Sequence, residues 1–221
     1  MTSDPRSLPV ATGYDAVYQA MSNAPTLRSA WREHAMGGGF PSEFEHISFV
    51  TLDELQRITG EFALSEGSTL VDLGCGMGGP GLWIARQASA RLIGVDLSSV
   101  GLGLASQRAL RLGMSGSARF VKGSFADTGL PAKSADGAVS FDALQYAPDK
   151  AAVFREAAKV IRPSGCLAFT AFEVIPEVVR SLPVLGDDPV DDYRPLLEAA
   201  GFSVTAYEET AGWRDRVAGA Y

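Results

Sequence analysis

Cysteine, histidine and positive charge are all scarce in this sequence. The 221 residues include two cysteines and two histidines, and the net charge is −7. Cys75 and Cys166 lie far apart and lack metal-ligand spacing, so we expect them to be buried thiols in a reducing compartment. An acidic chain without a run of Lys or Arg also lacks the basic face typical of nucleic-acid binders. The composition therefore argues against a metal centre and against a nucleic-acid partner.

Long apolar runs are missing as well. No run of about 18 apolar residues is present to span a bilayer, and the N-terminus Met1–Arg6 lacks the basic-then-apolar pattern of a signal peptide. These absences predict a soluble, cytoplasmic protein without a membrane partner. The hydrophobic residues, 46% of the chain, are enough for one sizeable core.

Short apolar runs alternate with longer amphipathic stretches after Gly81, which predicts βαβ units and a parallel sheet. The expected strands cover residues 69–73, 91–95, 118–122, 136–141, 165–172 and 202–207. The expected helices between them cover residues 80–89, 98–112, 149–161 and 191–200. The chain is therefore expected to have an α/β fold.

The segment before the sheet is expected to be helical. Residues 14–64 should form two or three helices, broken at Asn23–Pro25 and at Met36–Pro41. Ligands of open parallel sheets bind beyond the carboxyl ends of the strands, where an added helical layer can cover the crevice. We therefore expect residues 1–47 to form an N-terminal cap and residues 48–221 a sheet domain, as one structural unit.

A glycine-rich loop follows the first expected strand. Gly74, Gly76 and Gly79 fit the G-x-G-x-x-G spacing, in which glycine allows a tight turn and a close approach of the backbone to a ligand. Asp72 and Pro80 flank these glycines and argue against a pyrophosphate. Pro80 has no N–H to donate, and Asp72 would repel a phosphate. S-adenosylmethionine carries an ammonium and a sulfonium instead, which a carboxylate attracts.

At this loop the chain resembles the class I S-adenosylmethionine-dependent methyltransferases. Their first motif is a hydrophobic residue, Asp or Glu, and three glycines at alternate positions. It corresponds here to Val71, Asp72, Gly74, Gly76 and Gly78. The resemblance covers residues 45–210 and implies a Rossmann-like, doubly wound, mostly parallel sheet with helices on both faces. A seventh strand, at the C-terminal edge, is expected to be missing.

The resemblance also implies where the cofactor lies. Cys75 belongs to the loop, and Asp96 ends the second expected strand, where an acidic residue can accept hydrogen bonds from ribose. The alternative for Asp96 is a helix N-cap. Leu97 would contact the adenine face. Ser124 stands where many relatives have an adenine-binding Asp, and its neighbour Phe125 could pack on the ring; the alternative there is an ordinary turn.

The end of the fourth expected strand resembles the segment that lines the methionine end of the cofactor. Ser140 or Phe141 would lie beside the sulfonium, and Gln145 and Tyr146 stand where relatives often have substrate-facing residues. Gln145 replaces a potential base. The other residues expected to form the walls of the substrate pocket are Tyr14, Tyr18, Phe40 and Phe172.

His34 and His46 are the candidates for proton transfer, because histidine titrates near neutral pH. The alternative for both is a structural role in the cap. We place His46 and His34 with Gln145 as candidate catalytic residues.

The sequence therefore predicts SN2 transfer of a methyl group from S-adenosylmethionine to an oxygen, nitrogen or carbon nucleophile of a small molecule, without a metal, by a monomer or homodimer. Within the family it looks most similar to bacterial small-molecule or natural-product methyltransferases of type 11, which include UbiE-like members. A non-catalytic S-adenosylmethionine-binding protein and an NAD-type dehydrogenase are the alternatives.

Overall fold

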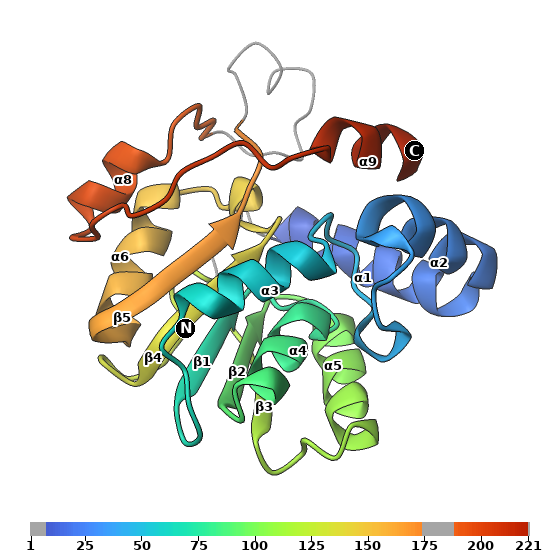
Figure 1. The fold of residues 1–221 in the computed structure, drawn as a ribbon, viewed down its shortest axis with the longest axis horizontal. Helices are drawn as coiled ribbons and strands as arrows, with labels where there is room; N and C mark the ends of the chain where they lie inside the picture. The colour runs from blue at the N-terminus through green and yellow to red at the C-terminus, as the bar shows by residue number, and fades with distance from the viewer. Residues whose placement is uncertain (1–7, 174–187, 221) are drawn as a thin grey trace.

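The computed structural model describes residues 8–173 and 188–220. One sheet of five parallel strands lies at its centre, in the order β3-β2-β1-β4-β5 (Figure 1). The strands are β1 Thr69–Leu73, β2 Arg91–Asp96, β3 Ala118–Lys122, β4 Ala135–Phe141 and β5 Ile161–Thr170. The chain order reverses beside β1, and ligands of such sheets bind at the carboxyl ends of the strands that flank this point.

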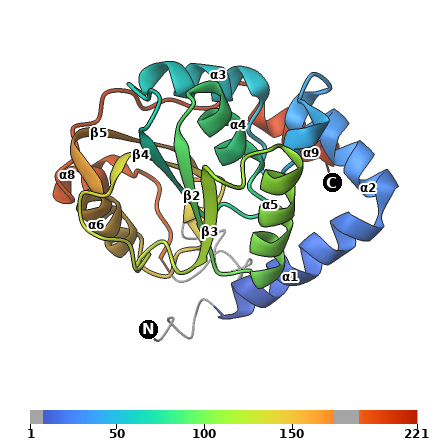
Figure 2. The ribbon, with the colours of Figure 1, turned by 90° about the horizontal axis from the view of Figure 1, so that it is seen from below.

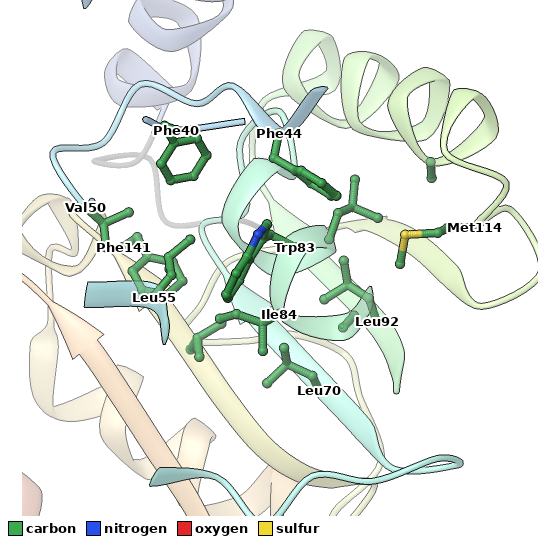
Figure 3. Close-up of a cluster of buried hydrophobic side chains, with 14 of the residues drawn as sticks. Phe40, Phe44, Val50, Leu55, Leu70, Trp83, Ile84, Leu92, Met114 and Phe141 are labelled. Carbon is green, nitrogen blue, oxygen red and sulfur yellow. The ribbon is translucent and has the colours of Figure 1, made fainter. Parts of the chain in front are cut away.

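Helices cover both faces of the sheet, as expected (Figure 2). One face packs on α3 Leu52–Glu61, α4 Gly79–Gln87 and α5 Ser99–Arg111, and the other on α6 Lys150–Val160 and α8 Arg194–Ala199. Because successive strand residues point to opposite faces, Leu70 packs under Trp83 and Ile84 of α4, while its neighbour Val71 belongs to the core below α6 (Figure 3).

Local capping explains where the helices begin. Thr51 and Glu54 form a capping box at α3, in which each side chain accepts a backbone N–H of the other residue. The side chains of Ser98 and Asp149 cap α5 and α6 by accepting the amides of Gly101 and Ala152, at 2.9 Å and 2.8 Å. The four expected helices after the first strand are thereby confirmed to within a few residues.

The cap consists of short helical pieces with breaks where they were expected. Its elements are α1 Leu8–Asn23, α2 Pro25–Trp31, a π-helix Arg32–Gly37 and a 3-10 helix Ser42–Phe44. Helix α1 lies along α5, and the carboxylate of Asp15 accepts hydrogen bonds from the Ser98 hydroxyl and, at 3.2 Å, from the Val100 amide. At the other end of the cap, the backbone carbonyl of Phe44 lies where a side chain at Gly79 would be. The cap therefore rests directly on the loop before α4.

The C-terminal part differs from the expectation. The strand predicted over 202–207 is wrong, because residues 201–210 form neither helix nor strand. Phe202 and Val204 do pack against the same core cluster as Leu167 and Phe169 of β5. The apolar pattern therefore reflects partial burial of these side chains, without backbone pairing to a neighbouring strand. Strand β5 begins at Ile161, four residues before its predicted start, because Ile161 pairs with Ala135 ahead of a bulge.

Helix α9 Trp213–Ala220 follows and lies against the π-helix of the cap (Figure 1). Arg216 on α9 donates to the Glu54 carboxylate at 2.9 Å, and the Trp213 ring packs edge-on against Phe172 after β5. These contacts join the last helix to both the cap and the sheet. Among the residues that the structure describes, no helix is long and apolar enough to cross a membrane.

Candidate functional site

A cavity opens at the carboxyl ends of β1, β2 and β4, beneath α1 and the segment after the 3-10 helix. Cap residues such as Tyr14 and His46 form one wall, and the loops that follow the three strands form the other. The expected crevice is therefore present, and the cap covers it.

Backbone geometry explains the glycines of the first loop. Gly74, Gly76 and Gly78 have φ angles of +77°, +49° and +75°, which L side chains rarely adopt. The amides of Gly74 and Cys75 both donate to the carbonyl of Val95, at 2.8 Å and 3.1 Å, which fixes the loop against β2. Gly74, Cys75 and Gly76 line the cavity, whereas Gly78 shapes the turn into α4 from outside it.

Asp72 is almost fully buried at the base of the cavity. Burial, and then the nearby charge of Asp96, raise the pKa of its carboxyl to about 8 from 3.8, although the Gly81 amide donates to it. No ion pair described in residues 8–173 and 188–220 involves Asp72 or Asp96. The floor of the cavity thus holds two neighbouring carboxyl groups and no cation.

Asp96 links the loop to the next helix. Its carboxylate accepts the amides of Gly76 and Ser98, each at 2.8 Å, while burial still raises its pKa. Ser98, rather than Asp96, caps α5, so capping does not account for the carboxylate. Leu97 and Phe125 also line this side of the cavity, at the position expected for an adenine.

Three tyrosines line the cavity, Tyr14 and Tyr18 from α1 and Tyr146 from the segment after β4. The Tyr18 hydroxyl occupies the space that a side chain at Gly76 would need, so Tyr18 lies over the glycine loop, where it lines the same cavity as Tyr14. The Tyr14 ring lies 5.8 Å from that of Tyr18 and 5.4 Å from that of Tyr146. The row connects the loop end of the cavity with the end of β4.

His46 is buried in the same wall and is held in one tautomer. Its Nδ1 accepts the Ser48 amide at 3.2 Å, so in the neutral ring Nε2 carries the proton. Burial, and then the charge of Arg108, lower the pKa of His46 to about 3 from 6.5. Nε2 has no hydrogen-bond partner among the described residues. His46 is therefore a neutral N–H donor at physiological pH.

Asp142 was missed by the sequence analysis, although it follows β4 as Asp96 ends β2. Its backbone has a φ of +51°, and the residue is one of those that line the cavity. The Phe49 amide donates to Oδ2 at 2.6 Å, and the Thr170 hydroxyl donates to Oδ1 at 2.7 Å. Burial raises the pKa of Asp142. Asp142 thus lies directly after β4, on the other side of β1 from Asp96.

Several predicted site residues do not reach the cavity. The Ser124 hydroxyl accepts the Ala126 amide in a local turn, at 3.1 Å. Ser140 points to the opposite side of β4 from Phe141 and donates to the Leu73 carbonyl at 2.7 Å. The Gln145 amide donates to the Asp142 carbonyl at 2.7 Å. These three polar groups support the loops instead.

The remaining candidates are also placed elsewhere. His34 is exposed on the π-helix and contacts Gly219 of α9. Phe40 packs in the core, with its ring 4.5 Å from that of His46, and Phe172 lies between Phe49 and Trp213. Of the three candidate catalytic residues, only His46 lines the cavity.

The residues present fit S-adenosylmethionine. The buried carboxyl of Asp72 suits a cationic ligand, because a positive charge nearby stabilises the ionised form. Asp96 retains lone pairs for hydroxyl donors, and Leu97 and Phe125 offer apolar contacts to a flat ring. In the part of the chain that the structure describes, no three His, Cys, Asp or Glu side chains are grouped so that they could hold a metal ion.

Comparison with known proteins agrees with this geometry. Residues 71–169 match a family described as a methyltransferase domain. The 27-O-demethylrifamycin SV methyltransferase of Amycolatopsis mediterranei is 27% identical over 213 residues, which cover 91% of this chain and 76% of that protein. A sterol 24-C-methyltransferase of Aspergillus fumigatus is 32% identical over 105 residues, which cover 48% of this chain and 28% of that protein.

Solved structures share the fold over nearly the whole chain. The cyclase SpnF matches with a TM-score of 0.71 and 22% identity, over 98% of this chain and 82% of that one. The geranyl diphosphate C-methyltransferase of Streptomyces coelicolor matches with a TM-score of 0.66 and 17% identity, over 90% and 79%. The sheet, the cavity at its carboxyl edge and these matches together identify residues 71–169 as a methyltransferase domain with the class I fold and with S-adenosylmethionine as its cofactor.

Proposed function

We propose that this chain methylates an oxygen, nitrogen or carbon atom of a small molecule. The observation that carries the proposal is one continuous cavity, with Asp72 and Asp96 at one end and Asp142 and Tyr146 at the other. When bound, S-adenosylmethionine supplies an activated methyl group. The chain contributes alignment of the acceptor and exclusion of water, which can account for a large part of the rate without a strong base.

For an acceptor that must lose a proton, we propose Asp142 as the base. Burial raises the pKa of Asp142 towards neutral pH, and a base with a pKa nearer the working pH transfers protons more effectively. His46 takes a different role from the one first expected. As a neutral ring with its proton on Nε2, it is a hydrogen-bond donor to a bound ligand and not a base. Gln145 and His34 have no direct role in this proposal.

The proposal also covers the class of acceptor, the cellular compartment and the oligomeric state. A net charge of −7 supports a small molecule rather than a nucleic acid as acceptor. Cys75 and Cys166 are free thiols, which supports a reducing compartment such as the cytoplasm. We propose a monomer or homodimer as the working state.

The experiment is turnover of S-adenosylmethionine with a panel of small hydroxyl, amine and activated-carbon acceptors. We expect S-adenosylhomocysteine and one methylated product to form in equal amounts. Binding of S-adenosylmethionine without transfer to any acceptor would contradict the proposal and favour a non-methylating use of the site. Thermal protection by NAD alone would point instead to a dehydrogenase.

Binding of S-adenosylmethionine at pH 7 is expected to release close to one proton. Because the pKa of Asp72 is about 8, the unliganded protein holds this proton at pH 7, and the incoming positive charge favours its loss. For the same reason the affinity should rise between about pH 6 and pH 8. Calorimetry in Pipes and in Tris measures the released proton, because the buffers differ in ionisation enthalpy.

Asp72→Asn is the matched variant, since it keeps the size of the side chain and removes the titration. It should bind with the same apparent enthalpy in both buffers, whereas the exposed-site control Asp53→Asn should behave as the wild type. Equal enthalpies for the wild type in the two buffers would show that Asp72 does not titrate on binding.

A further inference from the structure

A second cavity lies behind the glycine loop, between the cap and α5. We call it the arginine cavity, because Arg28, Arg108 and Arg111 line it together with Glu45. It shares His46 and Met77 with the cavity described above. The two spaces are therefore neighbours on either side of one wall.

Positive charge in the arginine cavity exceeds negative charge. Glu45 is the one acidic residue of its lining, and it already pairs with Arg28, at 3.2 Å, and with Arg32. None of the ion pairs in the described part of the chain involves Arg108 or Arg111. A chain with a net charge of −7 thus gathers three arginines around one cavity, with Arg108 buried, Arg28 partly exposed and Arg111 exposed, and with one acidic residue beside them.

Arg108 is the buried cation of this cavity, and its charge has no acidic partner among the described ion pairs. Its side chain is buried, and its Nη1 donates to the carbonyl of Met77 at 2.6 Å. Burial, and then the charges of Arg111 and Arg28, lower the pKa of Arg108 to about 10, so it remains a cation at neutral pH. A buried charge without an opposite charge is strongly unfavourable. An anion in the cavity would compensate it.

His46 adds a neutral donor to the same lining. It is 5% exposed, and its Nε2 has no partner among the described residues. A buried N–H without an acceptor is also unfavourable. Guanidinium groups and an N–H together match the oxygens of a carboxylate or a phosphate.

We propose that the arginine cavity is an anion-binding site that takes a carboxylate or phosphate group. Two sources share this chemistry: the amino-acid carboxylate of the cofactor, or an anionic group of the methyl acceptor. Only the second source rests on the proposed function. The competing explanation is structural, with Arg108 serving only to hold the Met77 carbonyl and so the glycine loop.

The test measures binding of inorganic phosphate by calorimetry at constant ionic strength. Arg111→Gln removes one charge from the lining and leaves the contact between Arg108 and Met77 intact, and Arg28→Gln is a second, independent variant. Arg155→Gln is the matched control, because Arg155 is exposed on α6. We expect saturable phosphate binding, weakened about tenfold in each cavity variant and unchanged in the control.

Repeating the titration with S-adenosylhomocysteine identifies the source. If the cofactor carboxylate occupies the site, S-adenosylhomocysteine excludes phosphate, and Arg111→Gln and Arg28→Gln weaken its binding too. If the acceptor supplies the anion, phosphate binds equally well to the S-adenosylhomocysteine complex. The proposal is overturned if phosphate shows no saturable binding and both variants keep the wild-type affinity for S-adenosylhomocysteine. Neither measurement needs methyl transfer, so an enzyme inactive on every acceptor would leave the result intact.

Discussion

Asp142→Asn is expected to lower kcat about 100-fold to 10,000-fold for an acceptor that must lose a proton, with the affinity for S-adenosylhomocysteine unchanged within about twofold. This is the usual contribution of a positioned general base. Asp142 is the one carboxylate at the acceptor end among the residues described as lining the cavity, and Asn keeps its size while removing its basicity. Steady-state kinetics and calorimetry measure the two quantities separately.

The pH profile separates a base from a structural group. A base must be ionised, so the wild-type rate should fall with decreasing pH, at a value above the ordinary aspartate pKa because burial raises the pKa of Asp142. In the Asp142→Asn variant the rate should no longer fall as the pH decreases through this range. The rate should show no transition near pH 6.5 from His46, because the pKa of His46 is about 3.

Loss of folding is the main complication, since Asn cannot accept both the Phe49 amide and the Thr170 hydroxyl as the carboxylate does. One unpaired donor is expected to cost about 1–3 kcal/mol of stability. Thr170→Val removes one of these hydrogen bonds and keeps the carboxylate, so it serves as the control for stability. If Thr170→Val loses as much kcat as Asp142→Asn, or if the rate of Asp142→Asn still falls as the pH decreases through this range, Asp142 is not the base.

The sequence predicted best the features that local pattern determines. The first three strands and the helices between them follow from apolar runs, caps and glycines that are close together in the chain, and so does the pairing of Asp72 with Asp96 at the carboxyl ends of β1 and β2. Neighbouring parallel strands end at the same edge. Residues at the ends of such strands therefore lie near each other, and this proximity can be predicted without knowing how the rest of the chain packs.

Side-chain direction at the end of β4 was harder to predict. Ser140 and Phe141 are consecutive, so only one of them can face the cavity, and the sequence contains no sign of which. The structure turns Ser140 inward to the Leu73 carbonyl and leaves Phe141 in the lining. Asp142 then comes into the cavity through a positive φ, which an Asp tolerates more readily than most residues.

Cap residues depend on contacts between distant segments, and the sequence does not show these. Tyr18 was expected to form a wall of the acceptor pocket; it lines the cavity over Gly76, because α1 packs along α5. Both histidines were candidate bases, and His46 was favoured because it stands closer to the expected start of the sheet domain. The π-helix places His34 beside α9, whereas the segment after the 3-10 helix places His46 in the wall of the cavity.

The predicted strand over 202–207 failed for a related reason. Phe202 and Val204 alternate with exposed residues, as in a half-buried strand, and both do pack on the core beside β5. A strand also needs a neighbour that pairs with its backbone. Partial burial without such pairing leaves the segment outside the sheet, so the described sheet has five strands.

Asp96→Ala is expected to weaken the binding of S-adenosylhomocysteine about 100-fold or more. Hydrogen bonds to a charged group contribute about 1.5–3 kcal/mol each, and a factor of 100 corresponds to about 2.7 kcal/mol. Asp96 is proposed to accept ribose hydroxyls while it holds the Gly76 and Ser98 amides, so its loss removes ligand contacts and also loosens the loop. Calorimetric titration of the folded variant measures the effect.

Two further variants separate these contributions. Asp96→Asn keeps an acceptor oxygen for one backbone amide and should therefore lose less affinity than Asp96→Ala. Asp15→Asn is the matched control, because Asp15 contacts the same Ser98 from α1 but is not among the residues that line the cavity. Asp15→Asn should keep its affinity within about threefold. If Asp96→Ala remains folded and binds as tightly as Asp15→Asn, the ribose assignment is wrong.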